Sequence, residues 1–214
     1  TVRFEMMKQF GYFVTESTRH NSEYLPYFRQ TAALRERFRL AHREVPMTPR
    51  RVREWQTDGA AEGEAPTAPV GELHRSQEYT TGIIEAMLTN VPFRFNGNVM
   101  NTGLITNLPD GCCVEVPCMV DATRVNPCYV GALPAQLAAL NQSNVAVQEL
   151  AVQAVLERDR EAAFWACALD PLTSAILPLH KLREMFDELW AAEEQHLQWF
   201  DPDFEGPLPE ICAP

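Results

Sequence analysis

The sequence lacks the features that mark several large classes of protein. No apolar run approaches the roughly 20 residues that cross a bilayer, and the first residues, TVRFEMMKQFGYF, contain no signal-peptide cleavage site. Lys and Arg total 18 against 29 Asp and Glu, for a net charge of -11, so no basic surface is available to follow a phosphate backbone. We therefore expect a cytoplasmic protein that binds neither membranes nor nucleic acid.

Cysteine and histidine pairs at metal-binding spacing are also missing. The chain has six Cys but no CxxC or HxxxH pattern, which zinc sites usually require. Most of these cysteines lie in apolar strand or helix contexts. We expect reduced core thiols, and no metal site built from them: Cys112, Cys113, Cys118, Cys128, Cys167 and Cys212.

The stretch Phe95–Asp121, FNGNVMNTGLITNLPDGCCVEVPCMVD, organises the rest of the chain. Short apolar runs at 91–95, 103–105 and 112–120 are bounded by Gly, Pro and Asn, which is typical of short strands joined by tight loops. Elsewhere the apolar residues recur at helical spacing. The sequence therefore predicts an α+β fold, in which a small mixed or antiparallel sheet is surrounded by helices.

Polar side chains within this stretch are candidates for function. Strand alternation over 112–120 sets Glu115 among apolar neighbours, so it should be partnered or functional, because an unpaired buried carboxylate is costly. Side-chain amides in the expected loops both donate and accept hydrogen bonds, as sugar hydroxyls do. They are Asn96, Asn98, Asn101 and Asn107. The alternative is that they are turn residues in left-handed conformations.

The first part of the chain predicts two helix boundaries. Val2–Phe10 has helical periodicity and is followed by Gly11, as at many helix ends; a chain that opens inside a helix looks truncated. A second helix is expected to begin at Asn21 or Ser22, with Glu23 in its first turn. If it begins one turn earlier, His20, Glu23 and Tyr24 share a face. This group is either a helix cap with a packed histidine or a functional cluster.

Further helices are predicted over 31–44, 73–88, 135–156, 158–168 and 179–200, with a flexible acidic, Pro-rich loop at about 57–70. Neither side of that loop supplies a core alone, so we expect a single domain over 1–214. In the long helix, Asn141, Asn144 and Gln148 form an amide stripe, which is either exposed or directed at a polar cavity.

Several motifs together resemble a known family. They are FGYFVTES, HNSEYLPYF, RSQEY with GIIEAM, FNGNV, NTGLITNLPDGCCVEVPC, VGALPAQLAALN, VQELAVQAVLERDREAA and LDPLT. From Arg3 to about Leu197 the chain closely resembles the carboxy-terminal part of the family 4 glycoside hydrolases, in particular the branch of melibiase-type alpha-galactosidases and alpha-glucosidases.

The resemblance implies an NAD- and Mn2+-dependent alpha-glycosidase that departs from the usual pair of carboxylates. In such enzymes the sugar is oxidised at its third carbon, a base removes the proton at the second, and the glycosidic oxygen leaves by elimination. Water is then added and the hydride returns. The family's Gly-rich nucleotide turn and its metal-binding Cys and His motifs have no counterpart here, so the NAD-binding domain is expected upstream, and this chain has no assigned NAD-binding or metal-binding residue.

The motif HNSEYLPYF matches the segment that carries the family's proton-abstracting base. The resemblance therefore makes Tyr24 or Glu23 the catalytic base, with His20, Asn96, Asn98 and Asn101 as substrate-binding residues. The implied partners are a small, unphosphorylated alpha-hexoside, the upstream nucleotide domain, and further copies of the chain in a dimer or tetramer. The alternative is a non-catalytic carbohydrate-binding or oligomerisation module derived from such an enzyme.

Overall fold

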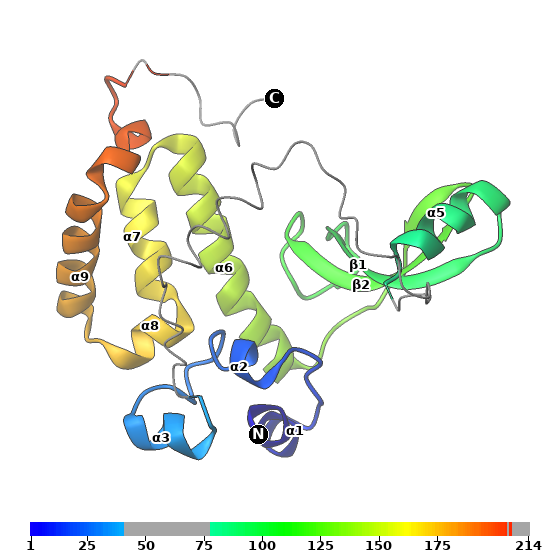
Figure 1. The fold of residues 1–214 in the computed structure, drawn as a ribbon, viewed down its shortest axis with the longest axis horizontal. Helices are drawn as coiled ribbons and strands as arrows, with labels where there is room; N and C mark the ends of the chain where they lie inside the picture. Colours follow the sequence, from blue (N-terminus) through cyan, green and yellow to red (C-terminus); the bar gives the residue numbers. More distant parts are fainter. Residues whose placement is uncertain (41–77, 205, 207–214) are drawn as a thin grey trace, which may run out of the picture.

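The computed structural model describes residues 1–40, 78–204 and 206, and it confirms an α+β architecture (Figure 1). The expected loop at 57–70 lies outside the described residues. In chain order, the elements are α1 (Val2–Phe10), α2 (Thr18–Asn21), α3 (Ala32–Arg37), α5 (Thr80–Thr89), β1 (Phe93–Met100), β2 (Cys113–Asp121), β3 (Arg124–Pro127), α6 (Ala135–Glu157), α7 (Arg160–Leu169), α8 (Pro171–Ile176), α9 (Leu179–Ala192), and the short 3-10 helices η1 (Glu194–His196) and η2 (Gln198–Phe200).

The strands form a three-stranded antiparallel sheet in the order β1-β2-β3. Alternation along β2 buries one face, where Val116 is 1% and Cys118 is 0% exposed, as the period of two predicts. The opposite face is open. Glu115 lies on this open face, opposite Asn98 of β1, so the expectation of a carboxylate enclosed by apolar neighbours is wrong. Strand β3 ends at Pro127, and beyond it Gly131 makes an isolated bridge with Ile105.

Helix α6 lies between the sheet and the other long helices, with α7 and α9 on its far side (Figure 1). Val145 of α6 joins the buried face of the sheet in one core cluster, and Leu140 packs against the cluster formed by α1 and the segment after α2. A third cluster joins α7 to α9 through Phe164, Leu182 and Phe186. One long helix therefore supports both the sheet and the amino-terminal segment.

The helix ends follow local chemistry. The terminal helix stops at Ala192, earlier than the periodicity predicts, and short 3-10 turns follow it. The Asp170 side chain accepts from the backbone N–H of Thr173 at 2.7 Å, and Pro171 begins the extra helix α8, since proline suits a first helical position. No helix in the described ranges is long and apolar enough to span a membrane.

Candidate functional site

The motif HNSEY forms a tight corner whose helix begins earlier than the preferred prediction. Ser17 caps α2 by accepting from the backbone N–H of His20 at 3.3 Å, and the helix ends at Asn21. The hydroxyl of Ser22 donates to the backbone carbonyl of Arg19, so it closes the helix instead of starting one. Glu23 and Tyr24 consequently lie just beyond the carboxyl end of α2.

A buried arginine holds this corner together. The guanidinium of Arg29 donates to Ser22 Oγ at 2.8 Å and to Glu23 Oε1 at 2.9 Å, and its side chain is 10% exposed. It also donates to the carbonyl of Arg19 at 3.4 Å. The Glu23 carboxylate therefore points toward Arg29.

Tyr24 lines a hollow of about 460 Å³ between α6 and the segments that follow α1 and α2. The amide stripe of α6, Asn141, Asn144 and Gln148, forms the facing wall, and Asn144 Nδ2 donates to the backbone carbonyl of Tyr24 at 3.3 Å. Both alternatives for the stripe hold in part, because all three side chains line the hollow while Asn141 and Gln148 are also exposed. Segments more than a hundred residues apart in sequence meet at this hollow, and Glu23 is not among its lining residues.

Two of the amides that line this hollow already use their Nδ2 groups as donors. Asn141 Nδ2 donates to the carbonyl of Leu137 at 2.8 Å, and Asn144 Nδ2 donates to that of Leu140 at 3.1 Å. Their amide oxygens receive no hydrogen bond from any residue that the structure describes. Asn21, which is 7% exposed, also lines the hollow, and its buried Oδ1 has no partner within the described ranges.

The predicted sugar-binding residues do not all meet at this hollow. Asn96 and Asn98 lie on strand β1, not in loops, and line a separate hollow of about 430 Å³ with Tyr79 and Glu115. The two hollows share no residue, so the predicted base Tyr24 and the predicted substrate-binding residues Asn96 and Asn98 do not line one pocket. His20 is exposed and lines neither hollow.

Asn101 stabilises the loop between β1 and β2. It is 1% exposed, its Nδ2 donates to the carbonyls of Ile105, Leu108 and Pro109 at 2.9–3.2 Å, and its Oδ1 accepts from the backbone N–H of Ile105 at 3.0 Å. Asn107 similarly pairs with both backbone groups of Leu133, at 2.8 and 2.9 Å. Both side-chain amides are hydrogen-bonded to backbone groups. Neither residue lines the Tyr24 hollow or the hollow on the sheet.

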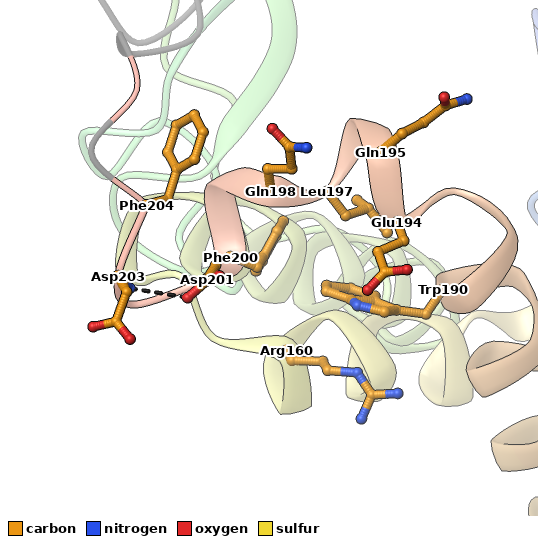
Figure 2. A pocket seen from close by; sticks show the side chains of 10 residues that line it. All are labelled: Arg160, Trp190, Glu194, Gln195, Leu197, Gln198, Phe200, Asp201, Asp203 and Phe204. Atoms are coloured by element: carbon orange, nitrogen blue, oxygen red, sulfur yellow. Dashed lines mark hydrogen bonds between the residues drawn. The ribbon is translucent and has the colours of Figure 1, made fainter.

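A larger hollow, of about 730 Å³, lies at the end of α7 and α9 (Figure 2). Trp190 and Phe200 meet edge to face with ring centroids 4.9 Å apart, and Arg160 lies beside Trp190, 5.2 Å from the ring centroid. Arg160 is already paired with Asp187 at 2.6 Å. None of the predicted site residues lines this hollow.

The described cysteines are unpaired, as expected for reduced thiols, but they are not uniformly in the core. Cys112 and Cys118 are buried, and burial raises the pKa of both thiols. Cys113 is exposed on the open face of β2, which corrects the expectation of a core thiol there. Within the described ranges, no group of three or more His, Cys, Asp or Glu side chains could hold a metal ion. Cys212 lies outside the described residues.

Comparison with known proteins identifies the family. Residues 1–173 match the family model described as the C-terminal domain of the family 4 glycosyl hydrolases, and the chain belongs to that family. An alpha-galactosidase of Bacillus subtilis (strain 168) is 43% identical over 209 residues, which are 95% of this chain and 46% of that protein.

One solved structure agrees with this assignment over most of the chain. The crystal structure of a candidate glucosidase from Bacillus subtilis, lplD, is 26% identical and aligns with a TM-score of 0.62 over 88% of this chain and 42% of that chain. A 6-phospho-alpha-glucosidase from gut microorganisms, solved in complex with NAD and Mn2+, is 27% identical with a TM-score of 0.48, over 53% of this chain and 26% of that one. The chain thus spans less than half the length of these relatives.

Sequence reasoning missed two residues of the corner. The sequence indicates Asn21 only as a possible helix cap, and it assigns no role to Arg29. A buried arginine with three hydrogen bonds has no signature in a single sequence, because its partners depend on how the chain turns between Ser22 and Arg29. Neither residue lies in a helix or strand, because α2 ends at Asn21 and α3 begins at Ala32, so no periodic pattern indicates the contact.

Proposed function

We propose that this chain is the sugar-binding half of an NAD- and Mn2+-dependent alpha-glycosidase that removes terminal alpha-hexosides, with alpha-galactosides as the preferred class. The observation that carries this proposal is the shared hollow of Tyr24 and the α6 amide stripe. Family membership and the 43% identity to an alpha-galactosidase support the reaction class.

We assign the proton-abstracting role to Tyr24 rather than Glu23. The phenol of Tyr24 belongs to a side chain that lines the hollow, whereas the Glu23 carboxylate bonds to Arg29 and lies 3.9 Å from Arg19. The hydrogen bond to Arg29 occupies the Glu23 carboxylate, and Glu23 does not line the hollow. Tyr24 is also fixed at its backbone by Asn144, which positions it for reaction.

The resemblance assigns NAD and Mn2+ to the upstream half of the parent protein, and the described residues include no group of three or more His, Cys, Asp or Glu that could hold a metal ion. When bound, these groups would supply the transient oxidation and the charge stabilisation that make the proton at the sugar's second carbon acidic. The contribution of this chain is then to orient the sugar, exclude water and accept that proton at Tyr24.

We further propose that other parts of the substrate, away from the carbon that reacts, are contacted by Asn96, Asn98 and His20. The side chains of Asn96 and Asn98 face the separate hollow on the sheet, so they would bind a more distant part of a glycoside or a second sugar. A cytoplasmic location and assembly into dimers or tetramers belong to the same proposal.

The experiment uses the full-length parent protein with NAD, Mn2+ and an aryl alpha-galactoside in deuterated water. Tyr24→Phe should lower solvent exchange at the sugar's second carbon by about 100-fold or more, the usual contribution of a general base. Tyr12→Phe is the matched control, since Tyr12 lines the same hollow and is also exposed; it should leave exchange nearly unchanged. Normal exchange in Tyr24→Phe would exclude Tyr24 from the reaction.

A non-catalytic carbohydrate-binding module is the second candidate, favoured by a hollow whose polar groups are neutral amides, a threonine and tyrosines. Such a module would bind the same sugars but would show neither hydrolysis nor proton exchange in the full-length protein.

A further inference from the structure

We propose that Asn21 is a specificity-determining residue of the Tyr24 hollow, and that it accepts a hydrogen bond from a hydroxyl group of a neutral sugar. The inference rests on the proposed function for its ligand class, because it concerns the hollow in which that function places the substrate. It adds a named recognition residue and a direction for the hydrogen bond.

The first argument is the unsatisfied amide of Asn21. Its side chain is 7% exposed, it lines the hollow, and its Oδ1 has no partner within the described part of the chain. A buried acceptor without a donor is destabilising, so such a group in a native structure calls for a ligand or another compensating role. The last bond of an asparagine side chain has a broad, two-fold torsional profile, so a small rotation brings the amide to a bound hydroxyl.

The second argument is the direction of the hydrogen bonds across the hollow. The Nδ2 groups of Asn141 and Asn144 already donate to carbonyls of their own helix, and Asn144 also donates to Tyr24. The oxygens of these two amides, like Oδ1 of Asn21, receive no hydrogen bond from the described residues, and only a hydrogen-bond donor can satisfy them. Hydroxyl groups donate, whereas a phosphate dianion or a carboxylate offers acceptors alone.

The third argument is charge. The residues that line the hollow include no Asp, Glu, Lys, Arg or His among those the structure describes. Recognition of phosphate or carboxylate usually uses arginine or lysine, and an anion in this hollow would face acceptor oxygens with no compensating cation. The hollow should therefore favour neutral hexosides over uronates and sugar phosphates.

The test measures equilibrium binding and melting temperature in the full-length protein without added NAD, so that no turnover occurs. The probes are methyl alpha-galactoside, galacturonic acid and galactose 6-phosphate. The unmodified protein should bind the neutral sugar at least about tenfold more tightly than either anion, because charged groups that stay unpaired in a low-polarity site are strongly disfavoured.

Asn21→Leu should change binding and stability in opposite directions. Loss of one hydrogen bond should weaken binding of methyl alpha-galactoside by about threefold to tenfold, while removal of an unpartnered buried amide should raise the melting temperature of the ligand-free protein. Gln142→Leu, at an exposed position of α6 that does not line the hollow, is the control for a general amide-to-leucine effect and should change neither quantity appreciably. Asn21→Ala removes the amide without adding apolar bulk and should also weaken binding.

Unchanged affinity in both Asn21 variants, a lower melting temperature in Asn21→Leu, or equal affinity for the three probes would each overturn the proposal. Failure of the unmodified protein to bind any of the sugars would overturn it as well. The outcome is separable from that of the proposed function: if binding depends on Asn21 but Tyr24→Phe exchanges protons normally, the recognition site stands and the catalytic assignment falls.

Discussion

The contact of Arg29 with Glu23 makes a sharp prediction about stability, because two arginines contact the same carboxylate in different surroundings. Arg29 lies 2.9 Å from Glu23 Oε1 with 10% of its side chain exposed, whereas Arg19 lies 3.9 Å away with 56% exposed. Breaking a buried ion pair costs about 3–5 kcal/mol, and an exposed pair is worth about 0–1 kcal/mol. The two arginines should therefore differ clearly when each is replaced by methionine.

The expected cost of Arg29→Met is about 2 kcal/mol in the free energy of unfolding, within the range for hydrogen bonds to charged groups. It falls below the value for a fully buried pair because the Glu23 side chain is 40% exposed and is rehydrated once its partner is gone. Arg19→Met, the matched control, should cost less than about 0.5 kcal/mol. Glu23→Gln should cost about 1–2 kcal/mol, because it leaves the buried guanidinium without a counter-charge.

The assay is urea unfolding of each purified variant, analysed by linear extrapolation. A double-mutant cycle of Arg29→Met with Glu23→Gln should show a coupling energy of at least about 1 kcal/mol, since the second change removes a contact that the first has already broken. Equal costs for Arg19→Met and Arg29→Met, or additivity of the cycle within about 0.5 kcal/mol, would refute the view that Arg29 anchors this corner.

Two further predictions concern titratable groups. A hydrogen bond from Arg183 holds the pKa of Glu161 below its ordinary value. The ion pair therefore stabilises the folded protein at pH values above the unfolded pKa of about 4.3, and this contribution is lost as pH falls through the lower folded pKa. Glu161→Gln should reduce the fall in melting temperature over this acidic pH range. An unchanged curve of melting temperature against pH would contradict a stabilising pair between Glu161 and Arg183. In native alkylation followed by mass spectrometry, exposed Cys113 should be labelled well before Cys118, whose burial raises its thiol pKa; labelling at equal rates would contradict the burial of Cys118.

Sequence patterns determined the elements whose signal is local. The end of α1 at Gly11 was predictable because a left-handed residue suits glycine, and Gly11 has φ 83°. The extent of α6 follows from Pro134 and a long helical period, and the buried face of β2 follows from simple alternation. Motif resemblance gave the family, and the family model match confirms it.

The tertiary structure decided which polar side chains meet. Asn98 and Asn101 looked equivalent in sequence, yet one lies on an open strand face and the other is enclosed by a loop, because strand β1 continues through the Asn-Gly-Asn run and the chain then folds around Asn101. Long-range packing of α6 against the corner after α2 brought Tyr24 to the amide stripe, and Oδ1 of Asn21 has no hydrogen-bond partner among the described residues. Composition and periodicity contain no information on contacts between segments so far apart in the chain, since those contacts arise only when the helices pack.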